Sequence, residues 1–231
     1  MNREDTVHRY VYAMDDGTDK TRLNTLKELM LEMVPTDYHE KCNFCPIHVE
    51  CYAPVTGVGN VNASIVFIGR NPGAEEDRSG LPFVGQGGAL LDTFIKWVGL
   101  DRNHLYITNL VKCFTTGNRV PTQAEINVCM VKWLREELQL LQPKLLVTFG
   151  REACAAMTGY ELKDARMKMT SYDHSTFLDG VKQISCTHPG AALRSAHYYK
   201  QFRDEASFVK VKCRELGLLQ DPIAAPLVSS V

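Results

Sequence analysis

The sequence contains no apolar run long enough to cross a membrane. A transmembrane helix needs about 18 or more predominantly apolar residues, and no such run occurs among the 231 residues. Residues 1–16 carry acidic side chains where a secretory signal would have its apolar segment. Internal repeats, low-complexity tracts and flexible linkers are also missing. We therefore expect a soluble, cytoplasmic protein with one domain over residues 1–231 and a weakly ordered lead-in over residues 1–20.

Cysteine is too scarce for a disulfide scaffold, because the chain has only eight. An excess of one charge is missing too: 26 Lys and Arg against 27 Asp and Glu argue against a general nucleic-acid coat. The charges are nevertheless uneven, with six basic and ten acidic residues over 1–50 and seven basic and three acidic over 182–215. The basic end fits either an anionic polymer or the solvated face of an amphipathic helix.

Short apolar, β-branched runs alternate with helical patterns along the chain. Strands are predicted at residues 64–69, 105–109, 144–150 and 183–187, and helices at 21–34, 87–98, 121–141, 151–157 and 196–217. This alternation indicates an α/β fold, a three-layer α/β/α sandwich around a short central parallel sheet. Parallel sheets bind ligands at the carboxyl ends of their strands, so the loops after the strands are the candidate site.

Polar side chains follow three of these strands. The first strand opens into a glycine-rich loop that presents Asn71 and Phe83, the second ends at Asn109, and the last precedes His188. The glycines let the backbone approach a ligand closely, but the loop matches neither GxGxxG nor the P-loop, so a nucleotide-binding enzyme is the weaker interpretation. We expect two amides and an imidazole to meet at one edge of the sheet.

Four motifs make the sequence recognisable: GRNPGAEEDRSGLPFVGQGG, ITNLVKC, GNRVP and THPGAALR. Together they resemble the uracil-DNA glycosylase superfamily, and most closely its iron-sulfur branch, family 4, over Cys42–Arg194. Such enzymes flip a damaged nucleotide out of the DNA and hydrolyse the bond between base and sugar. The resemblance implies a monomeric, monofunctional base excision repair enzyme whose partner is uracil-containing DNA and whose product is an abasic site.

The resemblance also implies roles for individual residues. Asn71 would orient the attacking water, and His188 would donate a hydrogen bond to the base oxygen that gains charge. Phe83 would stack on the base, and Asn109 would bind its edge. The other positions implied at the site are Gly69, Arg70 and Gly73 around the base, and Pro189, Leu193 and Arg194 against the DNA.

Two departures from the iron-sulfur branch bear on activity and specificity. Arg70 replaces a glutamate and Asn71 a small residue, which gives a GxNPG motif similar to the mismatch-specific and single-strand-selective branches. Gly73 stands where the strictly uracil-specific branch has a tyrosine, so we expect looser specificity that also admits 5-substituted uracils or other deaminated bases. Arg70 also keeps open an alternative, a weak or inactive DNA-binding or polymerase-accessory module on the same fold.

Four of the cysteines have the spacing of a metal site. Cys42 and Cys45 form a C-x2-C pair, and Cys113 and Cys129 follow among the other motifs. On ligand type alone a tetrahedral zinc competes, but the resemblance implies a structural 4Fe-4S cluster on these four residues, tying the N-terminal helical segment to the sheet.

The remaining reactive side chains are interpreted as structural. Cys51 is predicted not to be a ligand, and Cys154, Cys186 and Cys213 lie in apolar contexts typical of small buried residues. The carboxylates of residues 75–77 invite an acid/base or metal assignment. We interpret them instead as a solvated loop or the first turn of a helix.

Overall fold

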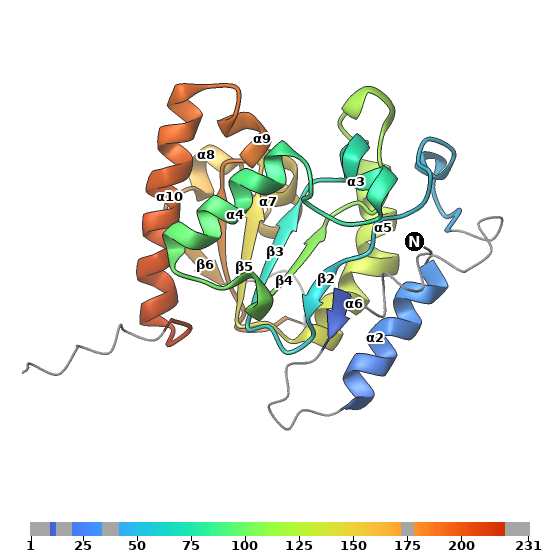
Figure 1. The fold of residues 1–231 in the computed structure, drawn as a ribbon, viewed down its shortest axis with the longest axis horizontal. Helices are drawn as coiled ribbons and strands as arrows, with labels where there is room; N and C mark the ends of the chain where they lie inside the picture. The colour runs from blue at the N-terminus through green and yellow to red at the C-terminus, as the bar shows by residue number, and fades with distance from the viewer. Residues whose placement is uncertain (1–9, 13–19, 34–41, 172–177, 220–231) are drawn as a thin grey trace, which may run out of the picture.

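A computed structural model describes residues 10–12, 20–33, 42–171 and 178–219. Its strands form one sheet in the order β1-β2-β4-β3-β5-β7-β6 (Figure 1). The four strands β4, β3, β5 and β7 are parallel, while β2 and β6 run antiparallel to their inner neighbours. The strands are β1 Val11–Tyr12, β2 Val58–Asn60, β3 Ile65–Gly69, β4 Leu105–Asn109, β5 Leu145–Phe149, β6 Met169–Ser171 and β7 Lys182–Cys186.

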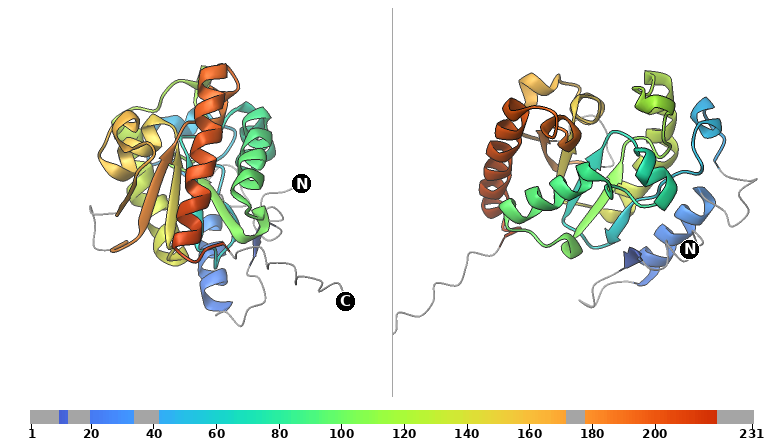
Figure 2. Two further views of the ribbon diagram at one scale, coloured as in Figure 1. Left: turned by 90° about the vertical axis from the view of Figure 1, so that its left-hand side faces the viewer. Right: turned by 45° about the horizontal axis from the view of Figure 1, so that its top comes forward.

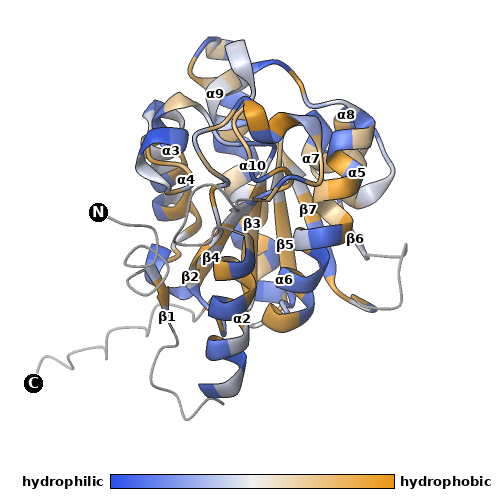
Figure 3. Ribbon diagram, turned by 90° about the vertical axis from the view of Figure 1, so that its right-hand side faces the viewer, coloured by the Kyte–Doolittle hydropathy of each residue, from blue (hydrophilic) through white to orange (hydrophobic). Residues whose placement is uncertain are grey.

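Helices cover both faces of the sheet, as predicted. Alternate side chains of β3 show the division: Ile65 and Phe67 pack with α4 and α10, whereas Val66 and Ile68 pack with α2 and α6. Burial on both faces explains why the central strands read as nearly continuous apolar runs, which Figure 3 shows in orange. Figure 2 shows α10 and α4 side by side over one face. The helices are α2 Lys20–Met33, α3 Ala74–Ser79, α4 Gln86–Val98, α5 Gln123–Cys129, α6 Arg135–Leu141, α7 Arg151–Thr158, α8 Leu162–Ala165, α9 Pro189–Ala192 and α10 Ala196–Glu215.

The helix predicted over residues 121–141 is continuous but not uniform. It begins at a capping box, in which the Thr122 side chain and the Glu125 carboxylate bond reciprocally to backbone N–H groups. A π-helical stretch, Met130–Leu134, then separates α5 from α6. The wider turn places Trp133 so that its indole N–H donates to the Cys42 sulfur at 3.2 Å.

Short edge elements were not predicted. Val11 and Tyr12, within the expected lead-in, form β1 beside β2, and the antiparallel β2 and β6 make the sheet mixed at its edges. These strands have two or three residues, too few to produce an alternating pattern. The rest of the lead-in, residues 1–9 and 13–19, lies outside the described part of the chain. Among the described helices, none combines the length and hydrophobicity needed to span a membrane.

The register of the sheet aligns the strand ends that carry the predicted site residues. Gly69 pairs with Asn109 across β3 and β4, and Phe149 pairs with Cys186 across β5 and β7. The loops after β3, β4, β5 and β7 therefore begin at one level and share one edge of the sheet.

Candidate active site

The predicted site residues from three strand ends meet at one cavity. Asn71, Phe83, Asn109 and His188 all line a hollow of about 400 Å³, which is within the usual size range of ligand sites. Arg70 and Gly73 line the same hollow. This cavity is called the base pocket below, after the base-binding roles predicted for Phe83 and Asn109.

Gly69 does not line the base pocket but lies directly beneath two residues that do. A Cβ atom at this position would come within 2.4 Å of Asn109 Oδ1 and 2.5 Å of Phe83 Cζ. Only glycine therefore lets both side chains approach the end of β3. Phe83 itself adopts a left-handed backbone conformation, φ 55°, which is uncommon for a bulky residue. Its ring lies 6.2 Å from the His188 ring at an interplanar angle of 30°.

A carboxylate that sequence reasoning did not assign holds the glycine-rich loop in shape. Glu76 Oε1 accepts hydrogen bonds from the Val84 and Gly85 N–H groups, both at 2.9 Å. Its other oxygen accepts from the Gly73 N–H at 3.0 Å. The acidic residues 75–77 do form the first turn of a short helix, α3, as interpreted, but Glu76 additionally clamps two parts of the loop together.

The Asn71 side chain is fixed at both ends. Its amide nitrogen donates to Thr115 Oγ1 at 3.2 Å and to the Pro72 carbonyl at 3.0 Å. Its oxygen accepts from Arg70 Nε at 2.6 Å. A second nitrogen of Arg70 donates to Asn118 Oδ1 at 2.7 Å. The loop after β4 thus orients Asn71, a function that the GNRVP motif did not reveal from sequence.

His188 is held as a neutral imidazole. Its Nδ1 caps α9 by accepting the Gly190 N–H at 3.0 Å, which places the ring proton on Nε2. Burial of the ring, followed by the nearby charge of Arg70, lowers the pKa of His188 to about 4. Gly150, with φ 99°, lies against the ring, since a Cβ there would be 3.3 Å from His188 Cβ. The arrangement provides one uncharged N–H donor near the base pocket.

The residue before His188 is held by a buried carboxylate from α10. Glu205 accepts the Thr187 N–H at 2.7 Å and the Thr187 hydroxyl at 3.0 Å. Burial raises the pKa of Glu205 to about 7, and Arg166 Nε lies 3.7 Å from its Oε1. Sequence analysis missed Glu205, which looks like any charged residue of an amphipathic helix.

The three residues predicted to meet DNA follow His188 at the rim of the site. Pro189 is buried in the first turn of α9. Leu193, just after α9, is 47% exposed, and Arg194 lines a neighbouring cavity that shares His188 with the base pocket. Of these three residues, Pro189 is therefore buried, whereas Leu193 and Arg194 are exposed.

The sequence comparison agrees with this geometry. Residues 56–210 match the family model of the uracil DNA glycosylase superfamily. The chain belongs to that superfamily.

Curated members of the superfamily align over most of the chain. A type-4 uracil-DNA glycosylase of Sulfurisphaera tokodaii is 40% identical over 183 residues, which cover 77% of this chain and 80% of the relative. Type-4 enzymes of Archaeoglobus fulgidus and Thermotoga maritima are 38% and 34% identical, over 71% and 73% of this chain and 82% and 86% of those proteins.

The four predicted ligand cysteines of this superfamily member line one small cavity between the segment at 42–51, the end of β4 and α5. Three of their sulfurs accept hydrogen bonds. Trp133 Nε1 donates to Cys42 at 3.2 Å, the Lys112 N–H to Cys129 at 3.3 Å, and the Ile47 N–H to Cys45. Such N–H contacts suit sulfur atoms that carry negative charge.

The surrounding protein stabilises three of these sulfurs, those of Cys45, Cys113 and Cys129, in the neutral thiol form. Burial raises the pKa of Cys129 to about 12 and also raises that of Cys45. The neighbouring Cys51 thiol, followed by burial, raises the pKa of Cys113. Within the described residues, no three His, Cys, Asp or Glu side chains gather closely enough to hold a single metal ion.

The ITNLVKC motif contains one lysine, Lys112, which lies outside the base pocket. Its side chain is fully buried, and Nζ contacts Glu137 Oε2 at 2.6 Å and Thr108 Oγ1 at 2.5 Å. Glu137 also accepts from the Tyr106 hydroxyl at 2.8 Å. The pair anchors the end of β4 to α6.

Proposed function

We propose that this protein is a monofunctional uracil-DNA glycosylase of base excision repair. It binds uracil-containing DNA as a monomer, flips the damaged nucleotide into the base pocket, hydrolyses the bond between base and sugar, and leaves an abasic site. The convergence of Asn71, Phe83, Asn109 and a neutral His188 on one cavity is the observation that carries the proposal.

The base is bound by stacking and by paired hydrogen bonds. The Phe83 ring supplies an apolar face at one wall of the pocket, and the Asn109 amide offers a donor and an acceptor to the edge of uracil. Gly69 leaves the room in which both side chains meet. Gly73 adds no side chain to the pocket, which supports a specificity that extends to 5-substituted uracils and other deaminated bases.

His188 acts on the departing base. As the glycosidic bond lengthens, negative charge grows on the uracil oxygens, and the Nε2–H of His188 donates to one of them. A donor already neutral and already oriented by its cap needs no rearrangement during the reaction. The Arg70 guanidinium, which lowers the pKa of His188 by its charge, adds positive potential at the same place.

Asn71 orients the water that attacks the sugar. Its oxygen has two lone pairs, of which Arg70 Nε occupies one, so the other remains to accept a hydrogen bond from water. Because an amide is a weak base, most of the catalysis comes from charge stabilisation and positioning. Lys112, buried against Glu137, has no access to the sugar, in agreement with an abasic product and an uncut strand.

Leu193 and Arg194 meet the DNA beside the flipped nucleotide. The exposed Leu193 side chain is placed to enter the gap in the base stack, and Arg194 to contact the backbone. Pro189 serves indirectly, because it starts the helix that presents both residues.

We assign Cys42, Cys45, Cys113 and Cys129 as ligands of a 4Fe-4S cluster. An all-sulfur donor set with three N–H contacts fits this group. When bound, the cluster supplies folding energy and takes no part in hydrolysis. Around it, Glu50 accepts the Thr116 N–H at 2.8 Å and pairs with Arg119, which joins the cysteine segment to the loop holding Asn71.

One observation supports a second candidate, a DNA-binding module without catalysis. Arg70 stands where the iron-sulfur branch has a glutamate, and its guanidinium contacts the oxygen of Asn71. In this alternative the Arg70 contact would hold Asn71 away from water while leaving the flipping pocket intact.

An excision assay separates the two candidates. The protein is incubated with end-labelled uracil oligonucleotides, either single-stranded or with uracil opposite adenine or guanine, and the products are run before and after alkali. A glycosylase gives cleavage only after alkali. An uncleaved substrate in every pairing, with DNA binding retained, would leave the binding module; cleavage before alkali would contradict the monofunctional assignment.

A further inference from the structure

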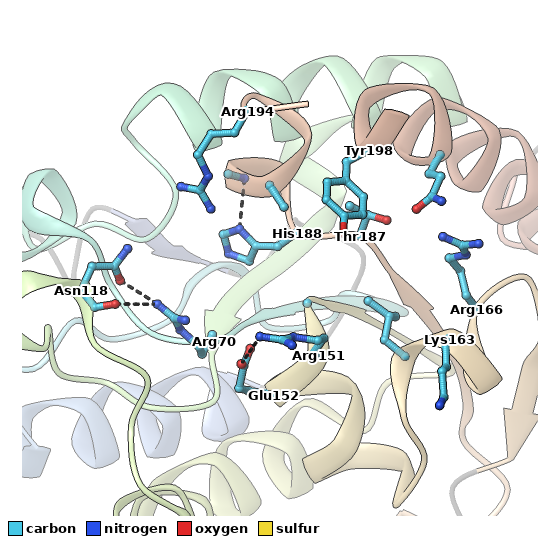
Figure 4. A pocket seen from close by; sticks show the side chains of 15 residues that line it. Arg70, Asn118, Arg151, Glu152, Lys163, Arg166, Thr187, His188, Arg194 and Tyr198 are labelled. Carbon is cyan, nitrogen blue, oxygen red and sulfur yellow. Dashed lines mark hydrogen bonds and ion pairs between the residues drawn. The ribbon is translucent and has the colours of Figure 1, made fainter. Parts of the chain in front are cut away.

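A second cavity, of about 520 Å³, lies on the other side of His188. It shares Arg70, Asn118, His188 and Gly190 with the base pocket. The remainder of its wall comes from α7, α8 and α10 and from the segment around α9. Figure 4 shows Arg70 and Asn118 at one end and Lys163 and Arg166 at the other, with His188 and Arg151 between them.

Positive side chains dominate this second cavity. Arg151, Lys163, Arg166 and Arg194 line it beyond the shared wall, and the part of the cavity between them is called the cationic basin here. Glu152 is the acidic residue among the described lining residues, and it lies 3.8 Å from Arg151. Four positive charges thus face one carboxylate.

The charges of the basin are weakly compensated. The contacts of Arg151 with Glu152 and of Arg166 with Glu205 are 3.8 and 3.7 Å long, beyond hydrogen-bond distance. Arg151 is also 76% exposed, so its pair is screened by water. Tyr198, 46% exposed, adds an aromatic ring to the wall. Guanidinium and ammonium groups around an open hollow are suited to phosphate.

The position of the basin identifies which phosphates it can reach. Because the two cavities share four lining residues, we expect a nucleotide whose base fills the base pocket to have its sugar, and the next phosphates of that strand, beside this shared wall. On the basin side these phosphates meet four cations. On the other side, the base pocket is bordered by Glu75 and Glu76 as well as Arg78. The two flanks of the target nucleotide are therefore electrostatically unequal.

We propose that the cationic basin binds backbone phosphates of the strand that carries the flipped nucleotide, on one flank of the target only. This proposal rests on the proposed function, since the flipped base fixes where the strand passes. The structure gives the enzyme a one-sided footprint, so that binding depends on DNA length on that flank more than on the other.

The test compares Arg151→Gln/Lys163→Gln with Lys96→Gln/Lys144→Gln, which removes the same charge from exposed positions outside both cavities. Arg166 is left intact because it contacts Glu205. The probe is a single-stranded oligonucleotide with a central 2′-fluoro-deoxyuridine, whose fluorine slows bond cleavage by disfavouring positive charge on the sugar. Two shorter versions keep only one nucleotide on the 5′ or on the 3′ side.

The basin variant is expected to bind the full oligonucleotide about tenfold more weakly, and its slope of log affinity against log salt should be shallower by about 0.7 per removed charge, the value for single strands. The control variant should bind like the wild type. Shortening one flank should abolish the difference between basin variant and wild type, while shortening the other should preserve it. Equal melting temperatures of the two variants show that both are folded.

Three results would contradict phosphate binding by the basin. The first is equal affinity and equal salt slope in the basin variant and the wild type, and the second is a difference between them that survives both truncations. The third is competition by millimolar deoxynucleoside monophosphate as strong as that by DNA, which would assign the basin to small anions. Single-turnover excision of ordinary uracil, run alongside, keeps the two proposals apart. If uracil is excised but binding does not depend on the length of one flank, only the basin proposal is contradicted. If binding depends on one flank but uracil is not excised, only the glycosylase proposal is contradicted.

Discussion

The base pocket and the cysteine cavity both bring together distant segments of the chain, but different groups hold the segments in place. Around the base pocket, carboxylates of the protein itself hold the segments in place: Glu76 clamps the glycine-rich loop, and Glu205 fixes the residue before His188. In the cysteine cavity, the protein keeps the thiols of Cys45, Cys113 and Cys129 neutral, and the bonding partner of the four sulfurs is the metal cluster proposed above. The difference indicates that the protein itself preorganises the base pocket, whereas the proposed cluster would hold the N-terminal segment.

The largest effect is expected from breaking the cysteine cavity. Cys129→Ser should prevent cluster binding and lower the free energy of unfolding by about 4 kcal/mol or more, because loss of a metal site is among the costliest single changes. The measurements are absorbance near 400 nm and thermal melting. Cys154→Ser, at a buried cysteine outside this cavity, is the control and should keep the absorbance. A colourless wild-type protein with the same melting temperature as Cys129→Ser would show that the thiols need no metal.

The next effect concerns catalysis without folding. His188→Asn keeps a side-chain oxygen that can cap α9 but removes the Nε2–H donor. The single-turnover excision rate should fall about 10²-fold or more, as for the loss of one donor to a developing anion, with an unchanged melting temperature. A rate within threefold of the wild type would move charge stabilisation to another residue.

A smaller effect is expected from loosening the glycine-rich loop. Glu76→Gln removes the charge from the group that accepts three backbone N–H bonds, and should destabilise the protein by about 1–2 kcal/mol. Uracil-containing DNA should also bind more weakly, since Phe83 lies in that loop. Glu136→Gln, which makes the same charge change at an exposed position outside both cavities, should have little effect on either measurement. Equal effects of the two substitutions would contradict the clamp.

The smallest change is expected in the pH profile. Burial and the charge of Arg70 keep the pKa of His188 near 4, below its ordinary value of about 6.5. The neutral ring therefore persists as pH falls from 8 to 5, and excision should lose activity through His188 only as pH approaches 4. In the unfolded chain this histidine takes up its proton near pH 6.5, so its contribution to stability declines below that pH. A rate profile that bends at pH 6.5, and loses that bend in His188→Asn, would mean that the ring is exposed to water.

The central strands and the main residues of the base pocket could be predicted from the sequence, but most of the residues that hold them in position could not. The central strands were predictable because burial on both faces makes them apolar runs, and Asn71, Asn109 and His188 because each follows such a run. Thr115 and Glu205 were missed, since their partners come from other segments and no local pattern marks them. Glu76 was missed because its contacts with Val84 and Gly85 form only when the glycine-rich loop folds back on itself. The cationic basin was missed because its charges come from separate segments: Arg151 from α7, Lys163 and Arg166 from α8 and its C-terminal end, and Arg194 from the turn after α9.

The assignment of the base pocket as a hydrolytic site is tested most directly by measuring release of free uracil from a uracil-containing oligonucleotide under single-turnover conditions, with wild type and Asn71→Ala side by side. The wild type should release uracil, and the variant should do so at least about 10²-fold more slowly while binding the same DNA with similar affinity. Equal rates for the two proteins, or no free uracil from the wild type, would contradict the assignment of the base pocket as a hydrolytic site.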